Sequence, residues 1–204
     1  MSILLDKMTV ILPTFNRAEM LPKALDSVLA QTHNNMEIIV ADDSSSDHTE
    51  AVMQPYLKDP RITYFKNKKN LGCHPNIRKA LYEFSSGKYC FIISDDNYLL
   101  EPDFLRNAAE TMDQHGSMLL FTNHITVFKE GQKTGQFKES QNLPEVSTGE
   151  YMYFGWHFPI FLNSSTVVFL REYAAKNLDP YDKNIVFADQ ELWFRFFLTD
   201  MRAR

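Results

Sequence analysis

Short apolar runs alternate with stretches of helical spacing through the first half of the chain. Four runs have the length of buried strands, namely Thr9–Leu12, Met36–Ala41, Ile62–Phe65 and Tyr89–Ser94. Apolar residues three and four positions apart predict helices behind Pro22, from near Thr49, over Ile77–Phe84 and over Pro102–Gln114. Pro13 is expected to close the first strand, and Gly87 to end the third helix. This alternation predicts an α/β fold with a mainly parallel sheet and helices on both faces.

The second half of the chain loses this rhythm. Strands are predicted at Met118–Thr122, Ile125–Phe128 and Thr166–Leu170. Between the last two, Glu130–Thr148 is polar and weakly patterned, which predicts a loop of the length seen in lids and binding loops. Asp189–Leu198 has helical spacing and an acidic first residue, which suits the positive end of a helix dipole.

Composition limits the classes of function. The chain has 204 residues, 44% of them apolar, enough for one well-buried core. Its formal net charge of -5 argues against a nucleic-acid partner, because phosphate binding normally needs a basic surplus. The sequence has neither a membrane-spanning apolar stretch nor a secretory leader, which favours a cytosolic location. Cys73 and Cys90 lack metal-type spacing, and a disulfide between them is not expected.

Acidic residues close two of the predicted strands. Asp42 and Asp43 follow the second strand, and Asp95, Asp96 and Asn97 follow the fourth. The carboxyl ends of parallel strands open into one crevice, so both acidic groups are expected to face one ligand. Clustered carboxylates repel one another unless a cation lies between them, which predicts a divalent metal with a phosphorylated ligand.

Five segments of the sequence, in this order, resemble family 2 glycosyltransferases of the GT-A fold. They are Val10–Arg17, Asp42–Asp47, Asn70–Gly72, Ser94–Asn97 and Ala188–Trp193. The resemblance implies one GT-A domain over residues 1–204 with a Rossmann-like sheet. Residues 1 to about 114 would bind a nucleotide sugar, and residues from about 115 to 204 would form a smaller, irregular half on the acceptor side. Family members usually continue further, so the protein is expected to extend beyond Arg204.

The resemblance assigns the end of the first strand to the nucleotide. Pro13, Thr14, Phe15 and Asn16 would contact the base or the ribose. From the residues alone, an equally good reading is a turn in which Asn16 caps a helix and Phe15 packs in the core. Arg17 stays unassigned, because an arginine here can bind a phosphate or brace neighbouring carboxylates.

The resemblance also gives the first acidic pair two different roles. Asp43 would accept a hydrogen bond from the uracil N3–H, and Asp42 would support the turn or the ribose, because successive strand residues face opposite sides. Asn70 and Gly72 would pass close to the base and diphosphate. The alternative is a solvated turn in which Asp and Ser side chains bond the local backbone.

At the second acidic group, the resemblance implies a metal site for Mn²⁺ or Mg²⁺. Asp96 would be the metal ligand with Asn97 beside it, and Asp95 would accept from ribose or sugar hydroxyls. The family pattern is Asp-x-Asp, whereas this chain ends it with an amide, which predicts weaker metal binding. The alternative is a helix N-cap near Asp95.

The resemblance also implies a general base in the late acidic motif, Ala188–Trp193. By resemblance Asp189 would take the proton from the acceptor hydroxyl, with Glu191 as an alternative base and a solvated helix start as the structural alternative. The implied reaction is a metal-assisted, inverting transfer of a sugar from a UDP-sugar to a saccharide or lipid-linked acceptor. The alternative function is a non-catalytic nucleotide-sugar-binding module or a truncated, inactive transferase domain.

Other nucleotide-dependent enzymes fit less well. Nucleotidyltransferases and dinucleotide oxidoreductases need a glycine-rich loop after the first strand, and Pro13–Arg17 contains no glycine. A cytoplasmic location is expected, including the inner face of a membrane. Membrane association is expected only through residues beyond the chain's end or through the acceptor.

Overall fold

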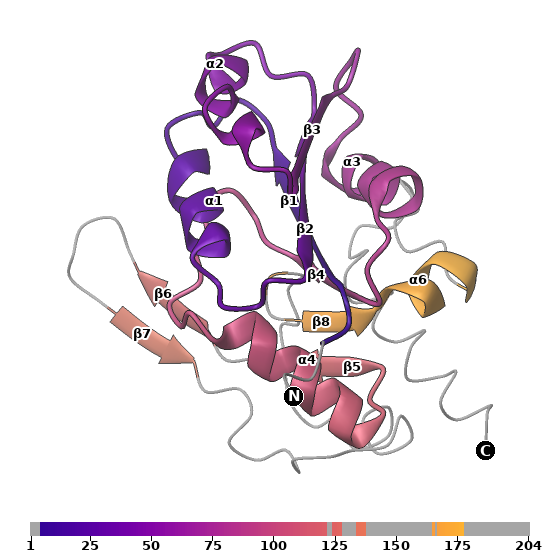
Figure 1. The fold of residues 1–204 in the computed structure, drawn as a ribbon. Helices are drawn as coiled ribbons and strands as arrows, with labels where there is room; N and C mark the ends of the chain where they lie inside the picture. Colours follow the sequence, from indigo (N-terminus) through magenta and orange to yellow (C-terminus); the bar gives the residue numbers. More distant parts are fainter. Residues whose placement is uncertain (1–4, 122–123, 128–133, 138–164, 166, 178–204) are drawn as a thin grey trace.

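The predicted alternation of strands and helices is present in the computed structural model, which describes residues 5–121, 124–127, 134–137, 165 and 167–177 (Figure 1). The strands are β1 (Met8–Thr14), β2 (Met36–Asp42), β3 (Ile62–Lys66), β4 (Tyr89–Ile92), β5 (Leu119–Phe121), β6 (His124–Val127), β7 (Thr134–Phe137) and β8 (Val167–Leu170). The helices are α1 (Leu21–Leu29), α2 (Thr49–Met53), α3 (Cys73–Lys79), α4 (Phe104–His115) and α6 (Arg171–Asn177). A 3₁₀ turn at Tyr56–Lys58 and a π-helical segment at Ala80–Phe84 complete the described helical elements.

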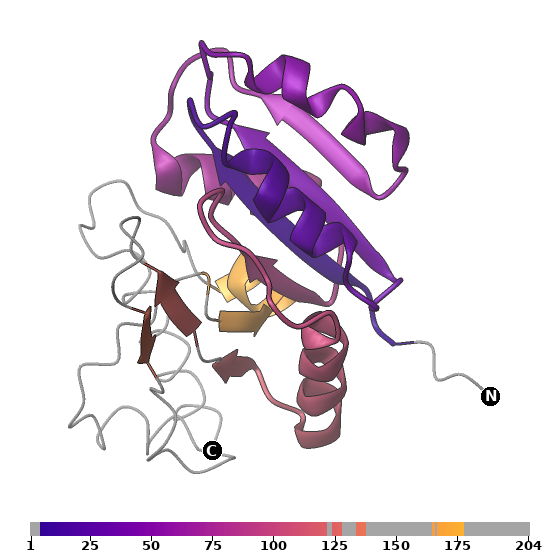
Figure 2. The same ribbon diagram turned by 90° about the vertical axis from the view of Figure 1, so that its left-hand side faces the viewer.

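The main sheet is mostly parallel, as predicted, and has six strands in the order β3-β2-β1-β4-β8-β5. β1 pairs in parallel with both β2 and β4, and β3 extends the parallel part beyond β2. β8 is antiparallel to its neighbours β4 and β5. A strand from late in the sequence therefore separates β4 from β5, an arrangement seen from the side of α1 in Figure 2.

Part of the predicted polar loop is a strand. β7 lies inside the segment 130–148 and pairs antiparallel with β6 in a separate two-stranded sheet. Its sequence, TGQF, has no apolar alternation, so periodicity alone does not reveal it. The helix predicted at Asp189–Leu198 lies outside the described residues.

β1 continues past Pro13, although the proline was expected to close it. The Ile11 carbonyl accepts from the Ile93 N–H on the β4 side, and the Thr14 carbonyl accepts from the Asp43 N–H on the β2 side. Strand alternation therefore turns the Pro13 nitrogen towards β4, where pairing with β1 has already ended at Ile11. The missing N–H costs no ladder bond, and β1 pairs with β2 through Thr14.

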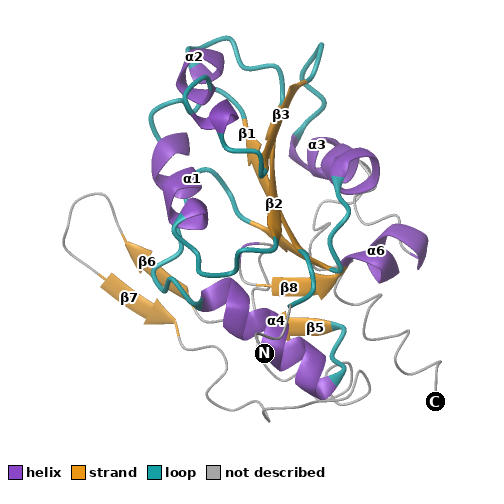
Figure 3. Cartoon of the chain, viewed as in Figure 1, coloured by secondary structure: helices purple, strands orange, loops and turns teal. Residues whose placement is uncertain are grey.

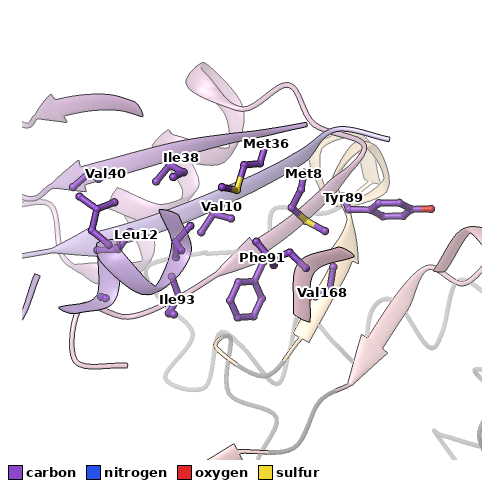
Figure 4. Packing of buried hydrophobic residues seen from close by; sticks show 14 of the residues in the cluster. Met8, Val10, Leu12, Met36, Ile38, Val40, Tyr89, Phe91, Ile93 and Val168 are labelled. Atoms are coloured by element: carbon purple, nitrogen blue, oxygen red, sulfur yellow. The ribbon is translucent and has the colours of Figure 1, made fainter. Parts of the chain in front are cut away.

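Alternating strand residues build a hydrophobic core on each face of the sheet. Figure 4 shows one of these cores, to which β1, β2, β4 and β8 each contribute. Helices α1 and α4 cover this face through their apolar stripes, which in α4 consist of the predicted residues Leu105, Ala108, Ala109 and Met112. Ile11, Ile39 and Ile92 point to the other face, which α3, the π-helical segment and α6 cover. Burial of each such aliphatic side chain stabilises the fold by about 1.5–3 kcal/mol.

Gly87 has a different role from the predicted helix stop. The helical segment ends at Phe84, and Ser85 already has an extended backbone. A Cβ at Gly87 would lie 2.7 Å from the Thr9 nitrogen and 2.8 Å from the Lys7 carbonyl oxygen. Glycine is needed here because the chain entering β4 passes against the backbone of β1.

Candidate functional site

The residues singled out from the sequence in the described part of the chain lie at the ends of β1 and β2 or in the loops that follow β1, β2, β3 and β4, teal in Figure 3. Thr14, the last residue of β1, contacts the first acidic pair, Asp42 and Asp43, and the second acidic pair, Asp95 and Asp96. Its carbonyl oxygen accepts from the Asp43 N–H at 2.9 Å, and its hydroxyl donates to Asp95 Oδ2 at 2.8 Å. The two acidic pairs therefore meet at the carboxyl end of one central strand, where parallel sheets place their ligands.

Arg17 braces the second acidic pair, which is one of the two roles left open for it. Its Nη1 donates to Asp95 Oδ1 at 2.9 Å and to Asp96 Oδ2 at 2.8 Å. The charge of Asp95 raises the pKa of Arg17, so the guanidinium stays protonated. Burial raises the pKa of Asp95, and the bonds from Thr14 and Arg17 oppose this shift.

Asp43 is a buried acceptor for the loop that follows β3. Its Oδ1 accepts from the Leu71 N–H at 2.8 Å and from Asn67 Nδ2 at 3.0 Å, and its Oδ2 accepts from the Gly72 N–H at 2.8 Å. An ionised carboxylate has about four acceptor positions. Among the bonds of the described residues, one of these positions, on Oδ2, has no donor.

Asp42 supports the turn after β2, the first of its two expected roles. It is fully buried, with Oδ1 accepting from the Ser45 N–H at 2.7 Å and Oδ2 accepting from the Tyr64 hydroxyl at 2.7 Å. Burial raises the pKa of Tyr64 far above its usual range, and the bond to Asp42 adds to the shift. The phenol therefore remains a donor. With no exposed surface, Asp42 does not reach a ribose in this conformation.

The side-chain amides of Asn67 and Asn76 form a buried network next to Asp43, which no sequence pattern indicated. Asn67 Nδ2 donates to Asp43 and also to Asn76 Oδ1 at 2.8 Å, while Asn67 Oδ1 accepts from Lys79 Nζ at 3.0 Å. Asn76 Nδ2 donates to the Ala41 carbonyl at 2.7 Å. The network ties the loop after β3 to α3 and β2. Asn67 lies among the lysines of residues 66–69, and nothing in this local sequence indicates that its side chain holds Asp43.

The structure excludes the alternative readings of Phe15 and Asn16. Phe15 is 44% exposed, so its ring is not part of the core. Asn16 is no helix cap, because α1 begins at Leu21. It has a left-handed backbone with φ 54°, and its Oδ1 accepts from the Ser46 N–H at 2.7 Å. Asn16 thus joins the loops after β1 and β2.

The other predicted nucleotide contacts lie on the same side of the molecule. Asn70 is exposed, and its Oδ1 accepts from the Gly72 N–H at 3.0 Å. Gly72 has φ 90°, a conformation that favours glycine, and it directs its N–H at Asp43. Pro13, partly buried, immediately precedes Thr14 at the end of β1.

The second acidic pair also fits a divalent cation that arrives with a phosphorylated ligand. Asp96 is 47% exposed at its side chain, and Asn97 beside it donates its N–H to the Ser94 carbonyl at 3.0 Å. Asp95 is no helix cap, because α4 begins only at Phe104. Within the described part of the chain, no three His, Cys, Asp or Glu side chains cluster to hold a metal by themselves. Mg²⁺-type sites with one or two carboxylates plus substrate phosphates need no such cluster.

Ser165, in the second half of the chain, bonds this edge of the sheet. The Ser94 N–H donates to Ser165 Oγ at 3.2 Å, just after β4. The predicted base Asp189 and its alternative Glu191 lie outside the described residues. Among the helices that the structure describes, none has the length and apolar character to span a membrane.

A family model described as glycosyl transferase family 2 matches residues 9–187. The chain belongs to this family. The match includes all the strand ends described above and ends just before the late acidic motif, Ala188–Trp193. The resemblance inferred from the five motifs is therefore confirmed.

Curated relatives cover most of the chain. A GalNAc(5)-diNAcBac-PP-undecaprenol beta-1,3-glucosyltransferase from Campylobacter jejuni is 34% identical over 168 residues, which is 78% of this chain and 52% of that protein. The succinoglycan biosynthesis protein ExoO of Rhizobium meliloti is 26% identical over 91% of this chain and 50% of its own length. This chain thus spans about half the length of these two relatives.

Solved structures confirm the GT-A fold. S. aureus TarS 1-349 in complex with UDP has a TM-score of 0.72 and 20% identity, over 95% of this chain and 54% of that one. The mannosyltransferase PcManGT from Pyrobaculum calidifontis, in complex with GDP-Man and Mn²⁺, has a TM-score of 0.61 and 20% identity, over 83% of this chain and 46% of its own.

Proposed function

We propose that this protein is an inverting glycosyltransferase that transfers a sugar from a UDP-sugar to an acceptor hydroxyl with the help of a divalent metal. The observation that carries the proposal is the contact of Thr14 with both acidic pairs. The contact joins the ends of β2 and β4, which flank β1 in the sheet. It supports a role for Asp43 in binding the nucleotide base and for Asp96, next to Asp95, in binding the metal.

In this proposal the donor nucleotide lies across the ends of β1 and β2. The free acceptor position on Asp43 Oδ2 suits the N3–H of uracil, a donor that cytosine lacks. Exposed Phe15 offers a ring for the base to stack on. Asn70 and Gly72 would border the base and diphosphate, and Asp95 has acceptor positions left for a ribose hydroxyl. TarS, which shares the fold, has been solved with UDP and with UDP-GlcNAc.

Asp96, with the amide oxygen of Asn97, would hold Mn²⁺ or Mg²⁺. When bound, the cation neutralises the charge that builds up on the leaving diphosphate. Arg17 and Thr14 hold Asp95 in place next to Asp96 in the sequence. The Mn²⁺ complex of PcManGT supports a metal in this fold.

Asp189 would take the proton from the acceptor hydroxyl as that oxygen attacks the anomeric carbon opposite the diphosphate. We assign about 1–114 to donor binding and about 115–204 to the acceptor side of one domain. The undecaprenol-linked substrate in the name of the Campylobacter relative favours a lipid-linked acceptor. We propose that the transfer takes place at the cytoplasmic face of a membrane.

Thermal shift with a panel of nucleotide diphosphates, each with and without Mn²⁺, tests this function. UDP plus Mn²⁺ should raise the melting temperature, and Asp96→Ala should abolish the part that depends on Mn²⁺. If UDP and Mn²⁺ stabilise the variant as well as the parent, Asp96 is not the metal ligand.

Turnover separates an enzyme from a binding module. Slow hydrolysis of the UDP-sugar without acceptor indicates a transferase, and Asp189→Asn should keep donor binding but lose transfer. Donor binding with no hydrolysis and no transfer would favour the binding module.

A further inference from the structure

Arg17 connects the two carboxylates of the second acidic pair through one atom. Nη1 lies 2.9 Å from Asp95 Oδ1 and 2.8 Å from Asp96 Oδ2. Adjacent ionised carboxylates repel each other, so a cation between them stabilises the pair. The Arg17 guanidinium therefore binds Asp96, the carboxylate that is the metal ligand in the proposed function.

The two contacts of Arg17 differ in strength. Asp95 has a side chain only 5% exposed and is also held by Thr14, so leaving its charge without a partner is costly. Asp96 and Arg17 are each 47% exposed at the side chain, and ion pairs that exposed contribute little to stability. The contact with Asp96 therefore exchanges more easily than the contact with Asp95.

Resting on the proposed function, we propose that Arg17 makes metal binding depend on the nucleotide. In the donor-free protein Arg17 forms an ion pair with Asp96. When a metal–nucleotide complex binds, Arg17 releases Asp96 but keeps its ion pair with Asp95. Arg17 is a positioning residue in this scheme.

The charges of these side chains explain why metal binding would depend on the nucleotide. Asp95, Asp96 and Arg17 together carry one negative charge, from two carboxylates and one guanidinium. A divalent cation alone would leave this cluster with a net positive charge and would have to displace the guanidinium from Asp96. A diphosphate that enters with the cation compensates both positive groups. Metal and nucleotide should therefore bind cooperatively, and by linkage each should raise the affinity for the other by the same factor.

The test measures Mn²⁺ affinity by electron paramagnetic resonance of free Mn²⁺, with and without saturating UDP. In Arg17→Met, Mn²⁺ alone should bind about twofold to fivefold more tightly than in wild type, since the competing ion pair is weak, and the gain from UDP should shrink. Arg61→Met is the matched control. It removes another arginine from a pair, with Asp59 at 2.8 Å, at the start of β3 and thus at the opposite end of the strands.

Arg17→Gln is the second variant, used if the methionine variant does not fold, because it keeps an N–H donor for Asp95 without the charge. The inference is overturned if the Arg17 variants bind Mn²⁺ alone no more tightly than wild type. Weaker binding by the variants would mean that Arg17 orients Asp96 for the metal. If wild type binds no Mn²⁺ even with UDP, the proposed metal role fails and the inference fails with it. If wild type binds Mn²⁺ with UDP and Asp96→Asn does not, the metal role stands whatever the Arg17 variants show.

Discussion

Replacement of Asn67 by leucine tests how the buried amide network supports the site. The substitution keeps the approximate volume of the side chain and removes three hydrogen bonds, to Asp43 at 3.0 Å, to Asn76 at 2.8 Å and from Lys79 at 3.0 Å. The backbone N–H of Asn67 keeps its bond to the Asp42 carbonyl. The change therefore isolates the side-chain network from the β3 backbone.

The three bonds differ in cost. The bond to the Asp43 carboxylate should contribute about 1.5–3 kcal/mol and the neutral bond to Asn76 about 1 kcal/mol. Lys79 is partly exposed, so water replaces its lost partner. We expect Asn67→Leu to lower the free energy of unfolding by about 2–4 kcal/mol. UDP affinity should fall as well, because Asp43 loses one of the three donors that hold its carboxylate in place.

Urea unfolding measures the stability change. Asn70→Leu is the matched control in the same loop, where the side chain is exposed and bonds the Gly72 N–H two residues away. It should change the free energy of unfolding by no more than about 0.5 kcal/mol. A loss below about 1 kcal/mol for Asn67→Leu, or equal losses for both variants, would refute the reasoning.

Three further predictions concern other parts of the fold. Gly87→Ala should lower the free energy of unfolding in urea by about 1–3 kcal/mol, because its Cβ would lie 2.7 Å from the Thr9 nitrogen; an unchanged midpoint would contradict this. Burial lowers the pKa of His33 from 6.5, so the unfolded chain binds a proton first as pH falls. Stability should therefore decline below pH 6.5, and urea unfolding at pH 7.5 and 5.5 should show a smaller decline for His33→Gln. Phe15→Ala should leave stability unchanged but weaken UDP binding in calorimetry about tenfold, as expected for loss of a stacking ring; equal affinity would remove Phe15 from the site.

Local periodicity predicted most of the fold because the core-forming residues repeat regularly. Leu21, Leu25 and Val28 of α1, whose spacing indicated a helix, are buried, and so are the four predicted residues of α4. The place of β8 between β4 and β5 was not predictable, since an apolar run identifies a strand but not its neighbours. Nor was β7, whose pairing with β6 involves a segment without apolar alternation.

The site was predictable to the level of strand ends. Acidic pairs after apolar runs indicated the convergence, and strand alternation separated the roles of Asp42 and Asp43. The contacts of Arg17 depend on how an exposed side chain is directed across the gap between two loops. The side-chain contacts of Asn67 include one with Lys79, at the far end of helix α3. Such contacts are long-range in the sequence, and no local pattern encodes them.

The most direct test of the account is a crystal structure with UDP and Mn²⁺, in which the anomalous signal locates the metal. We predict one Mn²⁺ bound to Asp96 and to the diphosphate, with the uracil N3–H on Asp43 Oδ2. A uracil far from Asp43, or a metal bound away from Asp96, would contradict the claim that the two acidic pairs serve one nucleotide.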